Sequence, residues 1–192
     1  MRLPQDNQTV QQMEDKFQNK YRTASSRLSG WDYGSDGLYF ITICTKPRLP
    51  YFGDVIIPED PDNAFVEYTD IGRASYENWL RIPEFHPYVQ LDDFVIMPDH
   101  VHGILFFNKP EKNNWEPNKF GPQRNNLGSV LRGYKGSLTQ YSILNNIEFG
   151  WQPRYYDRVI RDEKEYNNIR EYIYRNPRNW FSDKNGFEKF YL

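Results

Sequence analysis

His100 and His102 are the residues of this sequence best suited to metal chemistry. They stand two apart, with Val101 between them, in a stretch whose residues favour an extended chain. Side chains at i and i+2 of a strand point to one face, so both imidazoles could bind one divalent metal while Val101 faces the core. Histidine is a common metal ligand, and these are two of only three histidines in the chain. Because so short a pattern also occurs in surface loops, the pair alone leaves both interpretations open.

Tyr172 and Asn176 offer a second set of reactive groups, four residues apart in a segment that predicts a helix. Four residues correspond to about 40° around a helix axis, so both side chains share one face. A phenol nucleophile and an amide oxygen there could complete the metal site that the two histidines begin. The chain has 15 tyrosines, however, and packing is the usual role of a helical tyrosine. Asn176 could also simply end the helix ahead of Pro177.

Tyr172 is the predicted nucleophile because only this tyrosine has a metal-competent amide one helical turn further on. Tyr174 stands about 200° and Tyr166 about 240° away around the same helix. The two tyrosines ahead of the helix are better explained by packing or stacking. The tyrosines set aside are therefore Tyr155, Tyr156, Tyr166 and Tyr174.

The rest of the pattern predicts the elements that position these groups. β-Branched and aromatic residues predict strands over 38–45, 88–97 and 101–107. Apolar periodicity and capping residues predict helices over about 71–82, 127–144 and 163–175, the last capped by Asp162. The segment 53–68 indicates a loop with a short hairpin, and 108–125 a loop. This order favours an α+β protein with a ferredoxin-like antiparallel sheet, helices packed on one side, and a C-terminal helix carrying Tyr172.

The composition is that of a globular domain, with 17% aromatic and 38% hydrophobic residues in a chain of 192. A single cysteine, Cys44, excludes an internal disulfide and favours a reducing, cytoplasmic location. The polar N-terminus shows no signal peptide, and the longest apolar runs are too short to cross a bilayer.

Charge is distributed unevenly along the chain, although its formal net value is only −2. Six acidic residues and no lysine or arginine lie within 54–70. Seven basic and two acidic residues lie within 119–161, a local balance of +5 that could attract phosphate. The candidate DNA-binding residues of this region are Arg132, Lys135, Arg154, Arg158 and Arg161.

Three sequence blocks together resemble the single-tyrosine transposases of the HUH superfamily, in particular the REP-associated tyrosine transposases. They are PDHVHGI, RGYKGSLTQY and WQPRYYDRVIRDEKEYNNIREYIYRNP. The resemblance extends over about residues 31–180. It therefore divides the chain into an N-terminal arm (1–30), a transposase domain (31–180) and a C-terminal tail (181–192).

The resemblance implies a role for each candidate residue. His100 and His102 match the metal ligands, and Tyr172 the nucleophile. Asn176 matches a third, polar ligand that is glutamine in some relatives. The implied cofactor is a divalent metal, Mg²⁺ or Mn²⁺. The implied activity is cleavage and rejoining of single-stranded DNA, hairpin-containing, through a 5′-phosphotyrosine, by a monomer or homodimer with no membrane partner.

Two other functions remain compatible with the sequence. The first is a nonenzymatic nucleic-acid binder of RRM-like shape, in which either Tyr39 or Phe40 stacks on bases. The second is a metal-dependent phosphoesterase that uses water, which would not need Tyr172. A replication-initiator-like or relaxase-like nickase would share the chemistry of the transposase.

Overall fold

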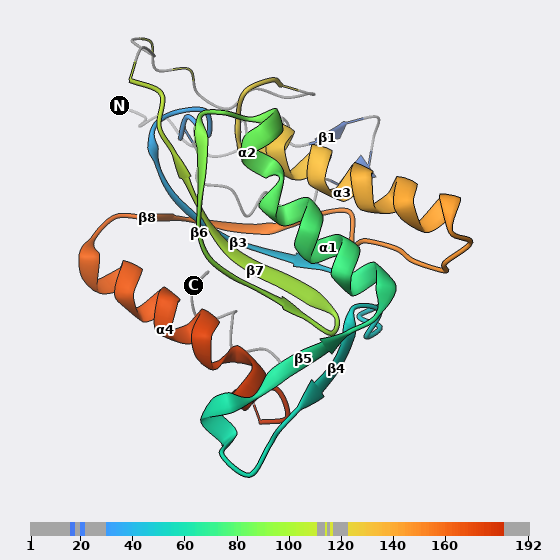
Figure 1. The fold of residues 1–192 in the computed structure, drawn as a ribbon. Coiled ribbons are helices and arrows are strands. Elements are labelled where there is room, and N and C mark those ends of the chain that lie inside the picture. Colours follow the sequence, from blue (N-terminus) through green and yellow to red (C-terminus); the bar gives the residue numbers. More distant parts are fainter. Residues whose placement is uncertain are drawn as a thin grey trace, which may run out of the picture.

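An antiparallel sheet of four strands forms the centre of the protein (Figure 1). The computed structural model describes residues 30–110, 114, 116 and 123–182, and the backbone of 16–17 and 20–21. The strand order in the sheet is β6-β7-β3-β8. Their bounds are β3 Gly37–Cys44, β6 Val89–Met97, β7 His100–Phe107 and β8 Tyr156–Ile160.

The register of the sheet sets the position of the histidines. β3 pairs with β7 from Gly37 opposite Phe107 to Cys44 opposite His100, so Thr42 lies opposite His102. β6 joins β7 through a tight turn at residues 98–99, and a bulge interrupts their pairing between Leu91 and Phe94. β8 pairs only with β3 and is an edge strand.

In the described part of the chain, four α-helices accompany the sheet, and three of them begin at a side chain that caps the first turn. They are α1 (Asp70–Leu80), α2 (Ile82–Phe85), α3 (Leu127–Leu144) and α4 (Glu163–Asn179). The side chains of Thr69, Asn126 and Asp162 accept hydrogen bonds from the first turns of α1, α3 and α4. Each cap satisfies a backbone N–H that has no partner within the helix.

The two faces of the sheet carry separate hydrophobic cores. Tyr39, Ile41 and Val101 point to the face that α1 and α3 cover. Phe40 and Ile104 point to the opposite face, where Ile169 and Ile173 of α4 pack on them. Figure 1 shows α1 and α3 on one side of the sheet and α4 on the other.

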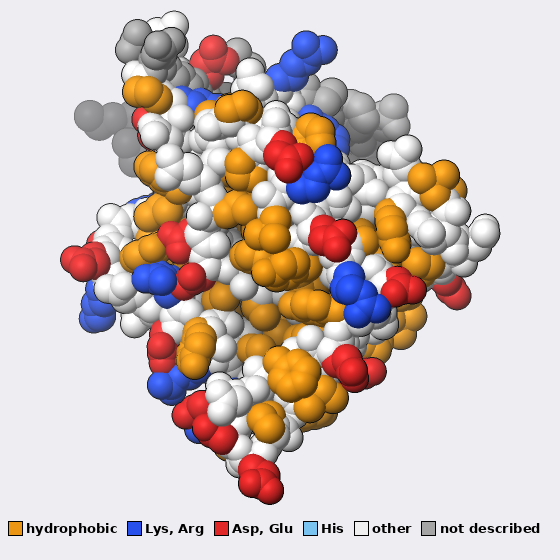
Figure 2. Space-filling view, in the orientation of Figure 1, with side chains coloured by type: hydrophobic (Ala, Val, Ile, Leu, Met, Phe, Trp, Pro, Cys, Tyr) orange, Lys and Arg blue, Asp and Glu red, His pale blue; other side chains and the backbone are white. Residues whose placement is uncertain are grey.

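A hairpin of β4 (Gly53–Ile56) and β5 (Phe65–Tyr68) extends from one end of the sheet, with the short helix η1 (Pro61–Asn63) at its tip. It contains most of the acidic segment 54–70. In Figure 2 acidic side chains mark this end of the molecule, and hydrophobic side chains gather beside them. The exposed hydrophobic residues of this region are Ile56, Ile57, Phe65, Tyr76 and Leu80.

The predicted α+β class and antiparallel sheet are confirmed, and so is the short hairpin within 53–68. Besides the four strands of the sheet, the chain carries β4, β5 and α2 between β3 and β6. Two further strands, β1 (Lys16–Phe17) and β2 (Lys20–Tyr21), pair with each other. The rest of the predicted arm, and residues 183–192 of the predicted tail, lie outside the described residues.

Three expectations about the elements were wrong. The fourth strand, β8, was missed because Tyr156–Ile160 is short and carries two charges. The helices do not pack on one side only, because β3 is apolar on both faces and α4 covers the second. Finally, α4 continues through Pro177 to Asn179. Proline in a last turn removes one hydrogen-bond donor but keeps a helical φ.

Among the residues that the structure describes, no helix is long and apolar enough to cross a membrane.

Candidate active site on the sheet face under α4

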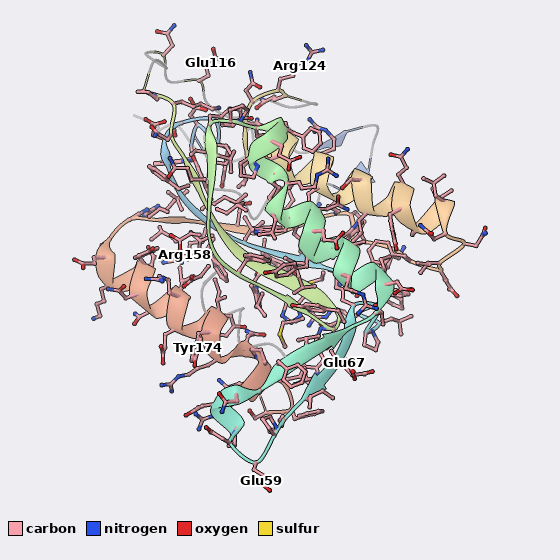
Figure 3. The ribbon with its side chains drawn as sticks, viewed as in Figure 1. Glu59, Glu67, Glu116, Arg124, Arg158 and Tyr174 are labelled. Carbon is pink, nitrogen blue, oxygen red and sulfur yellow. The ribbon has the colours of Figure 1, made fainter. Side chains whose placement is uncertain are left out.

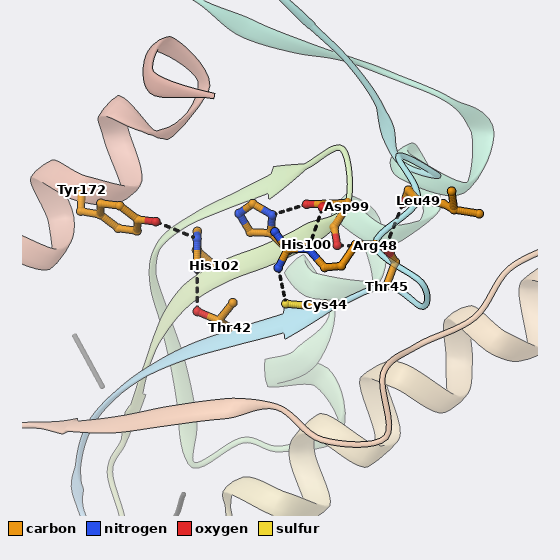
Figure 4. Close-up of polar contacts among 9 residues, drawn as sticks. All are labelled: Thr42, Cys44, Thr45, Arg48, Leu49, Asp99, His100, His102 and Tyr172. Atoms are coloured by element: carbon orange, nitrogen blue, oxygen red, sulfur yellow. Dashed lines mark hydrogen bonds and ion pairs between the residues drawn. The ribbon is translucent and has the colours of Figure 1, made fainter. Parts of the chain in front are cut away.

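β7 presents His100 and His102 on the same sheet face, with Val101 fully buried in the opposite core. The centroids of the two imidazole rings are 4.4 Å apart (Figure 4). Both side chains are buried, at 3% and 0% exposure. The i, i+2 spacing thus produces a pair of adjacent imidazoles on one face, as strand geometry dictates.

Each imidazole is held by a hydrogen bond through its Nδ1 atom. His100 Nδ1 lies 2.6 Å from Asp99 Oδ1. His102 Nδ1 shares a hydrogen bond of 2.8 Å with Thr42 Oγ1, across the β3–β7 pair. The Asp99 carboxylate accepts from Nδ1–H of His100, which leaves the lone pair of that ring on Nε2, where it can bind a ligand. The Thr42 hydroxyl can accept or donate, so it orients the His102 ring without setting its tautomer.

Burial favours the neutral form of both imidazoles. Desolvation lowers the pKa of His102 well below its usual value, and repulsion from Arg48, and from His100 when that ring is protonated, lowers it further. Desolvation also lowers the pKa of His100, although the Asp99 carboxylate and the Asn176 side chain oppose the shift. Neutral imidazole is the form that binds metal ions, so the environment favours ligation over salt bridging.

α4 brings Tyr172 to the histidines from the other side of the site. Its hydroxyl lies 3.4 Å from His102 Nε2 (Figure 4). The phenol ring also meets Phe40 edge-on, with a centroid distance of 6.4 Å. Ile169, about one turn before Tyr172, and Ile173, the next residue, pack the helix on the sheet, so Tyr172 occupies the border between the core and the polar site.

Asn176 and Trp180 extend the site along α4. Asn176 is buried, at 7% exposure, and its side chain is near enough to His100 to raise the pKa of that imidazole against the effect of burial. The indole of Trp180 stacks on His100, with ring centroids 5.9 Å apart. Trp180 reaches this position because α4 continues beyond Pro177, which the sequence pattern did not indicate.

Two aspartates at the bulge in β6 contact the N-terminal half of α4. Asp92 and Asp93 lie at the bulge. Tyr166 donates its hydroxyl hydrogen to Asp92 over 2.7 Å, and Arg170 donates to Asp93 over 2.6 Å. These contacts set the position of the helix along the sheet, and therefore the position of Tyr172 relative to β7.

The four tyrosines set aside on sequence grounds lie in different surroundings. Tyr174 is 69% exposed and points away from the sheet (Figure 3). Tyr166 is engaged with Asp92, as described. Tyr155 packs against the core under α3, and Tyr156 lies opposite Thr42 at the start of the edge strand. Tyr172 is thus the one of the five candidates whose hydroxyl contacts a site histidine.

The five candidate DNA-binding residues do not form one surface. Arg132 and Lys135 lie on α3, on one side of the sheet, and line a pocket. Arg158 lies opposite Phe40, so its side chain is on the other side, paired with Glu165 of α4. Arg154 and Arg161 flank β8 and are exposed. Figure 3 shows Arg158 beside α4, away from the acidic hairpin of Glu59 and Glu67.

A polar network behind His100 was also missed in the sequence. Arg48 Nε donates to Asp99 Oδ2 over 2.7 Å, and its NH1 group donates to Cys44 Sγ over 3.0 Å. Asp99 therefore joins His100 to Arg48 while remaining buried, at 6% exposure. The position of Asp99 directly before His100 was the available signal. Arg48 is 51 residues away from it and gave none.

The donors at this site suit a divalent metal only if Asn176 takes part. No group of three or more histidine, cysteine, aspartate or glutamate side chains that could hold a metal occurs within the described residues. The two imidazoles of β7 and the buried Asn176 side chain of α4 lie on the same side of the sheet. Nitrogen and amide-oxygen donors suit Mn²⁺ and related ions, whereas Mg²⁺ prefers oxygen ligands.

Fold and site together define an α+β protein in which two strand histidines and one helix tyrosine meet over an antiparallel sheet. No protein-family model matches the chain. It is 37% identical over 171 residues to an uncharacterised protein of Haemophilus influenzae, covering 83% of this chain and 91% of that protein. A putative REP-associated tyrosine transposase of the same species is 27% identical over 154 residues, covering 76% and 73%.

Two further similarities carry the same family name. A REP-associated tyrosine transposase of Escherichia coli is 29% identical over 98 residues, which cover 51% of this chain and 49% of that one. The solved structure of a REP-associated tyrosine transposase bound to a REP hairpin shares the fold, with a TM-score of 0.51 at 19% identity over 82% of this chain and 72% of that one. The chain is thus similar to proteins named REP-associated tyrosine transposases, and it shares the fold of one of them.

Proposed function

We propose that this protein is a metal-dependent single-stranded DNA endonuclease and strand transferase that uses Tyr172 as its nucleophile. The observation that carries the proposal is the contact of 3.4 Å between the Tyr172 hydroxyl and His102 Nε2, beside His100. A phenol placed at a pair of neutral imidazoles has both the nucleophile and the metal-binding groups that phosphodiester transfer needs.

His100, His102 and Asn176 would hold the metal ion, Mg²⁺ or Mn²⁺. When bound, the ion would polarise a nonbridging oxygen of the scissile phosphate. The protein's own contribution is orientation. Asp99 and Thr42 fix the two imidazoles, and α4 fixes the phenol, so little reorganisation is required when the phosphate arrives.

In the chemical step, the Tyr172 oxygen attacks the scissile phosphorus and forms a new O–P bond. The bond from phosphorus to the 3′ oxygen breaks. The phenol loses its proton and the departing 3′ oxygen gains one, which gives a 5′-phosphotyrosine and a free 3′-OH. Because the new ester retains the phosphodiester energy, a second 3′-OH can attack it in the reverse sense, and the strand is rejoined without ATP.

Single-stranded DNA that carries a hairpin is the proposed substrate. The name of one structural neighbour states that it binds a REP hairpin, and the similarity of this chain to proteins of that name supports the same kind of substrate here. A nonenzymatic RRM-like binder is not supported, because Tyr39 and Phe40 are both fully buried and cannot stack on bases. Transposition, or processing of REP-type hairpins, would be the biological use.

The decisive experiment compares Tyr172→Phe with the matched control Tyr174→Phe on the same helix. Each protein is incubated with labelled single-stranded hairpins from its own genomic flanks and Mn²⁺ or Mg²⁺. The native protein and Tyr174→Phe should form a covalent adduct that denaturing gels resolve. Tyr172→Phe should bind DNA but form none, since only one hydroxyl is lost. Mass spectrometry should place the nucleotide on the peptide that contains Tyr172.

Two results would contradict the proposal. An adduct that survives in Tyr172→Phe would mean that another residue is the nucleophile. Metal-dependent cleavage without any adduct would instead indicate a phosphoesterase that uses water.

A further inference from the structure

A second concave site lies along α3, on the opposite side of the sheet from His100 and His102. Its volume is about 590 Å³, which is within the range of small-molecule sites. One face of α3 forms one wall, and the connection from α3 to β8 forms the other. Nothing in the chemistry proposed for Tyr172 uses this pocket.

The pocket is built from groups that recognise nucleotides. Arg132 and Lys135 supply positive charge, Trp151 and Tyr155 supply aromatic rings, and no carboxylate is among the residues that line it. Cations contact phosphates, and aromatic faces stack on bases without regard to sequence. A single-stranded nucleotide combines both features.

The walls are fixed to each other before any ligand arrives. Trp151 Nε1 donates to the Lys135 carbonyl oxygen over 3.2 Å. In return, the Lys135 ammonium donates to the Gln152 carbonyl oxygen over 2.6 Å. The Gln152 N–H donates to the Cys44 carbonyl oxygen over 2.9 Å, which ties the same wall to the end of β3. A pocket held in this way loses little entropy on binding.

Gly136 places no side chain on the α3 wall of the pocket. A Cβ atom at this position would meet no other atom within 4 Å, so core packing does not require a glycine there. Glycine is a poor helix former, yet Gly136 stands in the middle of α3 and lines the pocket. The absent side chain leaves room for a ligand to approach the helix closely.

The pocket is connected to the catalytic face by the edge strand β8. Tyr155 lines the pocket, while the next residue, Tyr156, lies opposite Thr42 and is 36% exposed. Successive residues of an extended chain point to opposite faces. A DNA strand that crosses this edge could therefore contact Tyr155 on one side and reach the Tyr172 site on the other.

We propose that the α3 pocket binds one nucleotide of the single-stranded DNA, outside the segment that Tyr172 cuts. The phosphate would lie against Arg132 and Lys135, and the base against Trp151 and Tyr155. This inference rests on the proposed function, because it takes single-stranded DNA as the substrate. It adds a second point of attachment that fixes the strand on the far side of β8.

The test uses the full chain with Tyr172→Phe, so that DNA is bound but not cut. Three variants are added singly to this background: Gly136→Ala, Gly136→Leu and the matched control Gly133→Ala. Gly133 is on the same helix, does not line the pocket, and has room for a Cβ, whose closest neighbour would be His86 Nε2 at 3.8 Å. Both alanine variants should raise the melting temperature by about 2–4 °C, because alanine favours the helix.

Binding is measured by fluorescence anisotropy with a random-sequence single-stranded oligonucleotide that contains 5-iododeoxyuridine, and the bound positions are mapped by photocrosslinking. Gly136→Leu should weaken binding about tenfold, which is the effect expected when one base no longer stacks. It should also remove the crosslink to the peptide of Trp151 and Tyr155. Gly136→Ala should have a smaller effect in the same direction, and Gly133→Ala should bind like the parent.

Unchanged affinity in Gly136→Leu, or no crosslink to this peptide in the parent, would overturn the inference. Equilibrium dialysis with a free deoxynucleoside monophosphate separates the two sources of a nucleotide. Saturable binding of the monophosphate without the oligonucleotide crosslink would assign the pocket to a free nucleotide and also overturn the inference. The adduct assay on Tyr172 is independent, so adducts without pocket crosslinks would leave the proposed function intact.

Discussion

Asp99 determines how His100 is oriented. Its two carboxylate oxygens are divided between His100 Nδ1 and Arg48 Nε, at 2.6 and 2.7 Å. A histidine that binds metal commonly donates its second ring hydrogen to such a carboxylate, which fixes the ring and increases its basicity. Asp99 is therefore a positioning residue that acts through His100.

Asp99→Asn should lower the affinity for Mn²⁺ by about 10- to 100-fold, because the amide has nearly the same shape but loses the charge. Titration monitored by electron paramagnetic resonance measures the affinity without requiring catalysis. Asp70→Asn is the control, since Asp70 is exposed and pairs with Arg73 on α1. An Mn²⁺ affinity equal to that of the native protein would show that Asp99 has only a structural role.

The site residues that could be predicted from the sequence are those that lie within a few residues of each other in the chain. The i, i+2 histidines and the i, i+4 pair of Tyr172 and Asn176 each share a face because strand and helix periodicities require it. Arg48 and Trp180 were missed. Both reach the site through contacts between segments far apart in the chain, and no local period encodes such contacts.

Among the elements, β7 carries the two histidines and contributes residues to both cores. Its even-numbered residues face α4, and its odd-numbered residues face α1 and α3. Gly103 stands between His102 and Ile104, where Trp79 of α1 approaches the strand. A Cβ atom there would lie 2.3 Å from the Trp79 ring. Absence of a side chain at Gly103 thus permits the close packing of α1 on the strand that carries the histidines.

Gly103→Ala should destabilise the protein by about 1–3 kcal/mol, because a fully buried indole must move to admit the methyl group. The free energy of unfolding in urea measures the effect. Gly133→Ala is the matched control and should instead raise stability by up to about 1 kcal/mol. A Gly103→Ala protein as stable as the control would mean that Trp79 can adjust freely.

Elements with strong periodicity or clear caps were predictable, and α3 was found with its observed bounds, Leu127–Leu144. β8 was not, because five residues with an adjacent aspartate and arginine do not show a clear strand pattern. Its place in the sheet depends on pairing with β3, more than a hundred residues earlier in the chain. Helix packing on both faces of the sheet could have been predicted from β3, because its apolar residues occur at both odd and even positions and therefore point to both faces.

Across the whole molecule, acidic and basic residues nearly balance, but acidic residues are concentrated in the β4–β5 hairpin. The acidic hairpin lies at one end (Figures 2 and 3), whereas the candidate DNA-binding residues lie on α3, in β8 and on either side of β8. A protein with a net charge of −2 cannot rely on its overall field to attract DNA. Local cations must therefore supply the phosphate contacts.

Replacing Arg154 and Arg158 with alanine should weaken single-strand binding and reduce the slope of log affinity against log salt by about 1 for each phosphate that is no longer neutralised. The slope is obtained from anisotropy titrations at several salt concentrations. Arg73→Ala is the control, because Arg73 lies on α1 and pairs with exposed Asp70. A slope that does not change in the double variant would show that other residues hold the phosphates.

The division of the protein into two cores of different size has a consequence for its motions. Among the described residues, the core under α1 and α3 contains twenty buried residues, whereas that under α4 contains five. Local unfolding costs least where few apolar contacts are broken. The helix that carries Tyr172 should therefore detach from the sheet more often than α3 does. In hydrogen–deuterium exchange, the amides of α4 should exchange faster than those of α3, and bound single-stranded DNA should slow them selectively.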